Sequence, residues 1–155
     1  TTVDQIPLER LVTLATVLDL TVESAGGQIR LEHVRGSGVA DIGGCILRTC
    51  WCDRHMQGSG AKAPRLDIDA AAYLLEGGVR TVTADFPLAD EAADLLLHNN
   101  CVLVHCLSGL DQLQRRIVRL VALPIKLRDT YSAEARVIAI EEEQGASGET
   151  DQFFA

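Results

Sequence analysis

Apolar runs separated by glycine, proline and asparagine turns predict the strands of this chain. The run Cys101–Leu107 lies between Asn99-Asn100 and Ser108-Gly109, which is the pattern of a short buried strand between two turns. The same pattern predicts strands in the second half of 11–20 and in residues 45–52, 79–84 and 136–140.

Helical spacing predicts helices between these strands. Residues 70–76 are rich in alanine and leucine, follow two candidate aspartate caps, Asp67 and Asp69, and end at Gly77-Gly78. Residues 90–97 predict a further helix.

A third helix is expected after the strand at residues 101–107. Its apolar positions recur at helical spacing, three arginines follow as the helix dipole favours, and Pro124 ends it. The apolar positions are Leu110, Leu113, Ile117 and Leu120.

The alternation of strands and helices indicates an α/β fold. We expect one domain over residues 1–140, with a mixed, partly parallel sheet and flanking helices. Residues 141–155 are acidic and contain glycine, so we expect a flexible tail there.

Composition and charge argue against nucleic acid and membranes as partners of this chain. The chain has 155 residues, 47% of them hydrophobic, which is enough for a core. A net charge of −8 argues against nucleic acid as a partner. No apolar run is long enough to span a bilayer and no signal segment opens the sequence, so we expect no membrane partner and a cytoplasmic protein. The odd number of cysteines, five, favours reduced thiols.

Two residues at strand ends are candidates for chemistry. His105 interrupts its apolar run, and a neutral imidazole can ligate a metal or act as a general base; a hydrogen-bonded structural histidine is the alternative. Asp85 closes the strand at 79–84, where α/β proteins often place functional groups, although it can equally cap a turn.

The cysteines offer a weaker alternative. Cys45, Cys50, Cys52 and His55 have the side chains of a zinc site. On the predicted strand, however, Cys50 and Cys52 share one face and Cys45 lies on the other, which favours core positions. Cys101 and Cys106 are interpreted as core residues for the same reason.

Several blocks of sequence resemble the cyclase family of metal-dependent hydrolases, which includes bacterial kynurenine formamidases. Residues 72–87 are similar to its helix, Gly-Val turn, strand and terminal aspartate, and residues 100–113 to its next strand and Asn-Leu-Asp-x-Leu segment. The remaining similar blocks are residues 6–12, 45–51, 122–127 and 136–140.

This resemblance implies a function. It implies hydrolysis of an amide, or opening or closing of a cyclic ester or amide, by water activated on a divalent metal, zinc or manganese. The substrate is a small molecule, and a homo-oligomer is expected. His105 is the expected metal ligand or base and Asp85 a supporting catalytic carboxylate. The expected walls of an aromatic substrate pocket are Trp51, Phe86 and Tyr131, although isolated aromatic residues are more often core.

The sequence also departs from the family pattern. The family's His-x-x-x-His-x-Asp motif would precede the block at residues 6–12, and these 155 residues contain no such motif. Ala93 stands where the family has a ligand histidine, and His105 where it has a ligand glutamate. Three alternatives remain open: a hydrolase seen without its amino-terminal metal-binding segment, an inactive homologue that serves as a binding or assembly subunit, and a divergent member whose metal set uses His105 and cysteines.

Overall fold

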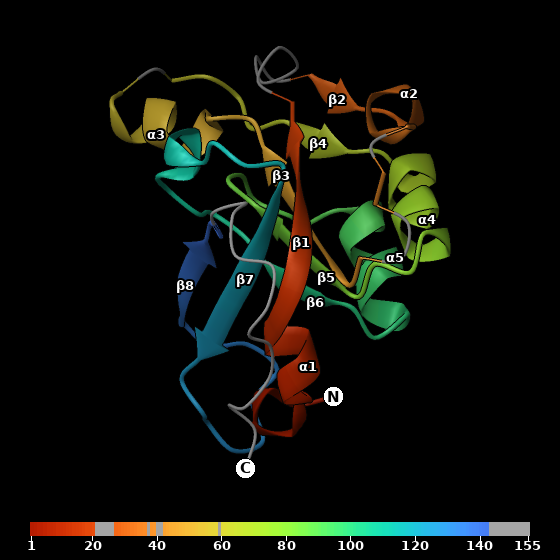
Figure 1. Cartoon of the computed structure of the whole chain (residues 1–155), viewed down its shortest axis with the longest axis vertical. Helices are drawn as coiled ribbons and strands as arrows, with labels where there is room; N and C mark the ends of the chain where they lie inside the picture. The colour runs from red at the N-terminus through yellow and green to blue at the C-terminus, as the bar shows by residue number, and fades with distance from the viewer. Residues whose placement is uncertain (21–26, 37, 40–41, 59, 143–155) are drawn as a thin grey trace.

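The chain folds around one mixed sheet of six strands in the order β6-β5-β3-β1-β7-β8 (Figure 1). This computed structural model describes residues 1–20, 27–36, 38–39, 42–58 and 60–142. The strands of the sheet are β1 (Val12–Asp19), β3 (Gly44–Arg48), β5 (Thr81–Ala84), β6 (Val102–Val104), β7 (Ile117–Pro124) and β8 (Ala135–Ile140). A separate pair is formed by β2 (Gln28–Ile29) and β4 (Arg65–Leu66).

The helices are short and connect the strands. The α-helices are α1 (Leu8–Leu11), α2 (Leu31–Val34), α3 (Trp51–Met56), α4 (Ile68–Glu76) and α5 (Glu91–His98). The 3-10 turns are η1 (Val3–Gln5) and η3 (Leu110–Gln112).

Strand β1 joins a parallel half of the sheet to an antiparallel half. Strand β3 runs parallel to β1, with Gly44 opposite Ala15, and β5 and β6 continue the parallel pairing. On the other edge of β1, β7 is antiparallel, with Leu120 opposite Thr13, and β8 is antiparallel to β7. The prediction of an α/β fold with a mixed, partly parallel sheet is therefore confirmed.

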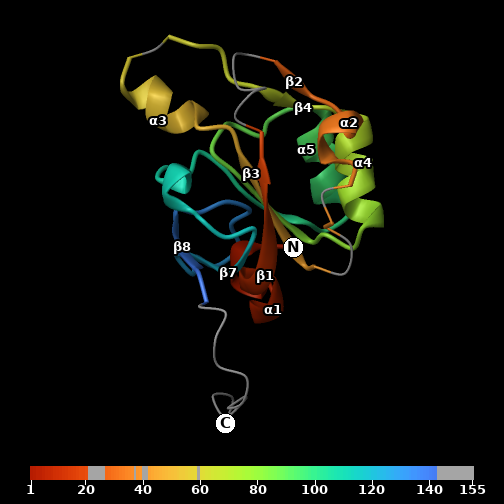
Figure 2. The same ribbon diagram turned by 45° about the horizontal axis from the view of Figure 1, so that its top comes forward.

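Two apolar layers cover the two faces of the central strands. Helices α2, α4 and α5 lie to one side, while β7, β8 and the segment after β6 lie to the other (Figure 2). The larger core forms under the helices and includes Leu47, Leu74 and Phe86. The smaller core forms where Leu110 packs with Ile46 and the neighbouring residues of β1 and β7.

The burial of each strand follows from its position in the sheet. All four residues of β5 are buried, because β3 and β6 flank this strand and Val82 and Ala84 belong to the larger core. Residues of β7 alternate between buried and accessible positions, because only one face of the antiparallel half is covered.

The prediction of a helix over Leu110 to Leu120 is wrong. Only the 3-10 turn η3 forms there, and residues from Ile117 onward form strand β7. Leu110 and Leu120 are buried together, as the spacing suggested, but they meet through the sheet rather than along one helix. Pairing of β7 with both β1 and β8 outweighs the local helical spacing.

The strand expected over residues 45–52 is too long. Strand β3 ends at Arg48, and helix α3 begins at Trp51. Cys50 between them has a left-handed backbone with φ of 58°. The argument that Cys50 and Cys52 share a strand face therefore does not apply.

Other local predictions are confirmed. Helix α4 begins after Asp67, whose carboxylate accepts a hydrogen bond from the Ile68 amide at 3.0 Å, and it ends at Gly77. Helix α5 and strands β5 and β8 lie within a few residues of their expected positions.

Of the flexible tail expected over residues 141–155, residues 143–155 lie outside the described residues. The first two are held by contacts: Glu141 accepts a hydrogen bond from the Gln114 amide at 2.6 Å, and Glu142 forms an ion pair with Arg119 at 2.9 Å.

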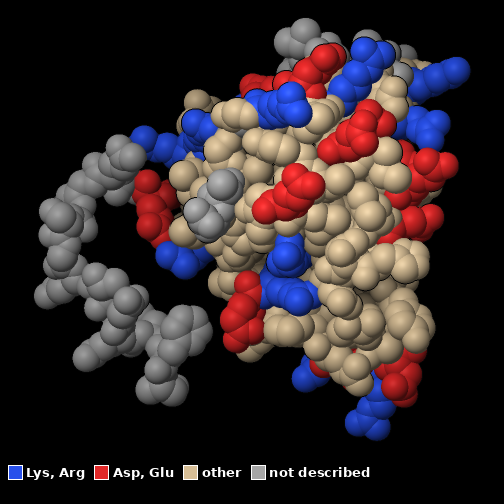
Figure 3. Space-filling view, turned by 90° about the vertical axis from the view of Figure 1, so that its right-hand side faces the viewer, with Lys and Arg blue, Asp and Glu red and all other residues tan. Residues whose placement is uncertain are grey.

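No helix in the described ranges is long and apolar enough to cross a membrane. On the face that carries α2 and α4, acidic and basic side chains are interspersed (Figure 3).

We expect Asp67→Ala to lower the free energy of unfolding by about 1 kcal/mol, because the start of α4 loses its cap. The carboxylate also accepts a hydrogen bond from the Gln28 side chain at 3.1 Å, which links the helix to β2. Urea unfolding monitored by circular dichroism measures the change. Asp69→Ala, at an exposed position in the first turn of the same helix, is the control, and an equal loss in both variants would contradict a specific capping role.

Candidate functional site

A cavity of about 590 Å³ opens beside edge strand β6. Its walls come from three parts of the chain: the first turns around α1, the segment from Asn100 to Leu107, and the connection between β7 and β8. Most of the lining side chains are apolar, and Arg10 and Glu134 contribute charge. The size and lining are typical of a small-molecule site.

His105 and Tyr131 both line this cavity. His105 follows β6 directly, at the carboxyl end of a parallel strand, and is exposed. Tyr131 is 83% exposed and comes from the β7–β8 connection. The structure thus brings together two of the five residues that the sequence singled out.

His105 has a cysteine as its immediate neighbour. Nδ1 of His105 lies 3.4 Å from Sγ of Cys106. Cys106 has a left-handed backbone with φ of 60° and is exposed, so its interpretation as a core residue was wrong. Partial burial nevertheless raises the pKa of the Cys106 thiol above its usual value. Cys101, by contrast, is buried as expected.

Asp85 is fully buried and braces the turn between β3 and α3. Its carboxylate accepts hydrogen bonds from the Thr49 hydroxyl at 2.7 Å, from the Thr49 amide at 2.9 Å and from the Cys50 amide. The guanidinium of Arg54 donates to the carbonyl oxygens of Thr49 and Cys50, so both sides of the turn are held. Burial raises the pKa of Asp85, and the three donors oppose that shift in part.

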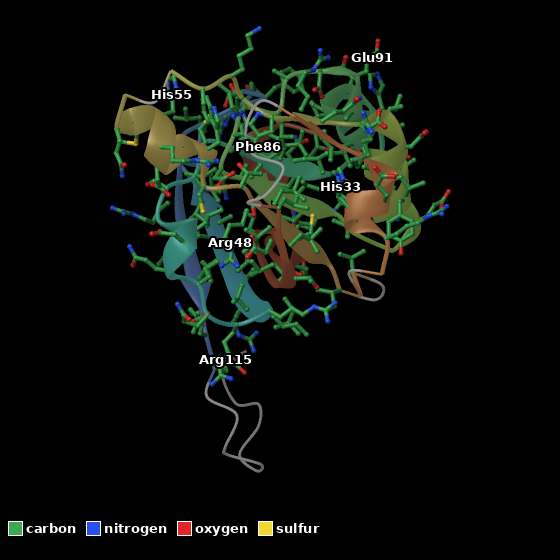
Figure 4. All side chains as sticks on the ribbon, turned by 90° about the horizontal axis from the view of Figure 1, so that it is seen from above. His33, Arg48, His55, Phe86, Glu91 and Arg115 are labelled. Carbon is green, nitrogen blue, oxygen red and sulfur yellow. The ribbon has the colours of Figure 1, made fainter. Side chains whose placement is uncertain are left out.

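Trp51 and Phe86 lie in the larger core. Phe86 is completely buried, in the interior seen in Figure 4, whereas His55 is exposed on α3. Trp51 stacks on His55 with ring centroids 4.5 Å apart and donates its indole N–H to the Ala61 carbonyl at 2.9 Å. Neither aromatic residue lines the cavity beside β6. Their role as substrate walls stays a prediction.

The described residues do not fit a divalent metal site. They contain no group of three histidine, cysteine, aspartate or glutamate side chains that could hold an ion, whereas a catalytic site needs about three protein ligands. Ala93 is 3% exposed on α5 and has no ligating atom. Cys45 is buried in the core, apart from the exposed His55.

Sequence reasoning missed a contact between α3 and the segment after β6. Sγ of Cys52 donates to the Cys106 carbonyl at 3.8 Å, and the Asp53 carboxylate accepts from the Gly109 amide at 3.2 Å. Helix α3 and η3 accordingly lie side by side in Figure 1. The Ser108-Gly109 turn indicated that the chain changes direction after β6. The start of α3 at Trp51 was not recognised, because it lies in an apolar run that was interpreted as a strand.

The fold is shared with hydrolases of known structure. An isatin hydrolase bound to the product analogue thioisatinate superposes with a TM-score of 0.78 at 21% identity, covering 92% of this chain and 64% of that one. Isatin hydrolase A from Ralstonia solanacearum gives a TM-score of 0.78 at 24% identity, covering 91% and 65%. A protein described as a potential metal-dependent hydrolase with cyclase activity gives 0.68 at 25% identity, covering 92% and 72%.

Sequence comparison gives the family. Residues 1–91, more than half of the chain, match the family described as "Putative cyclase", and the chain belongs to this cyclase family. No curated protein matches the sequence. The chain spans about 64% of the length of the isatin hydrolase bound to thioisatinate.

Proposed function

We propose that this protein binds a small amide, or a cyclic ester or amide, in the cavity beside β6 and hydrolyses it. The observation that carries the proposal is the position of His105, exposed at the end of a parallel strand and on the wall of a 590 Å³ cavity. The structural relatives that are named isatin hydrolases, and the one described as a potential metal-dependent hydrolase with cyclase activity, support the reaction class.

The cavity favours a partly apolar substrate. Apolar side chains around α1 and β6 can cover a ring, and Tyr131 can stack on an aromatic one. Arg10, from α1, and Glu134, from the β7–β8 connection, supply polar groups to the lining, which can orient a carbonyl or an amide N–H. A cyclic amide fused to an aromatic ring, or an N-acylated aromatic amine, has both an aromatic ring and an amide group.

His105 would act as the general base in this reaction. A neutral imidazole nitrogen can take a proton as an oxygen or sulfur nucleophile attacks the substrate carbonyl, and can then pass it to the departing nitrogen or oxygen. Activation of water on a metal would need ligands besides His105, and the described residues do not gather them.

The test is a comparison of His105→Ala with the wild-type protein on an N-formyl aromatic amine, a cyclic amide of the isatin type and an aromatic lactone. We expect kcat/KM for the accepted substrate to fall by about 100-fold or more, since a positioned base contributes at least that factor. His98→Ala, at an exposed position at the end of α5, is the matched control and should retain activity.

Absence of turnover by the wild-type chain, with and without added zinc or manganese, would contradict hydrolysis. It would favour the second candidate, a binding or assembly subunit. One observation supports that alternative: buried Ala93 stands where the resembled family has a ligand histidine. Retention of a cyclic amide in equilibrium dialysis, without its conversion, would then identify a binding protein.

A further inference from the structure

The end of β6 presents a thiol in a constrained conformation. Strand β6 ends at Val104, and Cys106 two residues later adopts a left-handed backbone, which is uncommon for a residue other than glycine. The next amide, that of Leu107, donates to the Ala84 carbonyl at 3.1 Å, which ties this position to the end of β5. The nucleophile elbow likewise exposes its reactive group on a strained residue in the turn that follows a strand.

The thiol has a base beside it and open space on two sides. Nδ1 of His105 lies 3.4 Å from Sγ of Cys106, close enough to receive the thiol proton. Cys106 lines both the 590 Å³ cavity and a second cavity of about 610 Å³ bounded by η3, β7 and β8. A substrate in either cavity can therefore reach it.

The other cysteines are placed differently. Cys45 and Cys101 are buried, and the Cys101 thiol donates to the Val79 carbonyl at 3.6 Å. The Cys52 thiol is directed to the Cys106 carbonyl. Cys50 provides its amide to Asp85 inside the braced turn. Among the five cysteines, Cys106 is the exposed one, and it has an imidazole at its sulfur.

We propose that Cys106 is the nucleophile of an acyl transfer in which His105 is the base, a mechanism that rests on the proposed hydrolase function for its substrate class. The sulfur attacks the substrate carbonyl carbon as His105 takes the thiol proton. The C–N or C–O bond then breaks, and the proton passes to the leaving nitrogen or oxygen. Water adds to the resulting thioester, the C–S bond breaks, and the carboxylic acid and the Cys106 thiol are released.

The first test is the rate at which each cysteine of the intact chain reacts with iodoacetamide near neutral pH, read by peptide mass spectrometry. We expect Cys106 to react fastest, because it is the exposed cysteine and His105 removes its proton as it reacts, which offsets the rise in its pKa that partial burial causes. The substitution His105→Phe removes this base and should slow the reaction by about 10-fold or more. Cys52→Ser is the control and should change the Cys106 rate by less than about twofold. Equal reactivity of Cys52 and Cys106, or a rate that is insensitive to His105→Phe, would overturn the proposal.

The second test detects the covalent intermediate with p-nitrophenyl acetate. We expect a burst of nitrophenolate of about one equivalent per chain and an acetyl group on Cys106, both lost in Cys106→Ser. No burst, or an acetyl group elsewhere, would refute the thioester.

Amide turnover separates this proposal from the function on which it rests. Labelling of Cys106 in a chain that hydrolyses no amide or lactone would refute the hydrolase proposal but leave the reactive thiol in place. Amide turnover that is lost in His105→Ala but unchanged in Cys106→Ser would support the hydrolase proposal and refute Cys106 as its nucleophile.

Discussion

Replacement of Asp85 by alanine should lower the free energy of unfolding by about 3–5 kcal/mol, as measured by urea denaturation. The buried carboxylate accepts hydrogen bonds from the Thr49 amide, the Thr49 hydroxyl and the Cys50 amide. Alanine leaves these donors without their acceptor in a buried turn, and each unsatisfied group costs about 1–3 kcal/mol before relaxation.

The effect should also reach the start of α3. The Thr49 hydroxyl accepts a hydrogen bond from the Trp51 amide at 3.3 Å, so its orientation affects the first helical residue. Asp69→Ala, on the exposed face of α4, is the control and should change stability by less than about 0.5 kcal/mol. If both variants lose the same stability, the carboxylate does not brace the turn.

The pH dependence of stability tests the charge on Asp85 through comparison with Asp85→Asn. Burial raises the folded-state pKa above its usual value of 3.8, so the folded chain holds this proton more tightly than the unfolded chain. The stability of the wild type relative to Asp85→Asn should therefore fall as pH rises from 3.8 through the raised pKa, and then stay level. If the stability of the wild type relative to Asp85→Asn instead rises over this interval, the folded-state pKa of Asp85 is lowered rather than raised.

Phe86→Ala should lower the free energy of unfolding by about 3–5 kcal/mol. The ring is completely buried in the larger core, and its removal loses apolar burial and leaves a cavity between the sheet and the helices. Phe86→Leu should lose less because it retains most of the volume.

Tyr131→Ala is the matched aromatic control for Phe86, since its side chain is 83% exposed; a stability change under about 0.5 kcal/mol is expected. Denaturant titration of the three variants gives the comparison. A Phe86→Ala variant that keeps its stability but binds substrate less tightly would place the ring at the site, as the resemblance implies.

Local signals predicted part of the fold. Helix α4 is defined by adjacent residues: a capping aspartate, a run of alanine and leucine, and a glycine pair. Strand β8 is likewise predicted by its β-branched residues. The segment at Leu110 to Leu120 was mistaken for a helix because its partner is β1, about a hundred residues away in the sequence.

The site was less accessible to sequence reasoning. His105 and Asp85 were recognised by their positions at strand ends, but their surroundings depend on turns between neighbouring strands. The brace at Asp85 needs β3 and β5 side by side, with Cys50 left-handed. The meeting of His105 and Cys106 in a cavity needs another left-handed residue and the distant β7–β8 connection.

The central place of β1 determines the order in which the sheet can be completed. In the sequence, residues 44–48, which pair with one edge of β1, follow β1 closely, whereas residues 117–121, which pair with its other edge, come much later. Until then β1 carries an open row of backbone donors and acceptors that can bind another extended chain. Pairing between strands far apart in the sequence is slow, so this edge of β1 is exposed for longer during folding than the edge that pairs with β3, and β7 covers it in the folded chain.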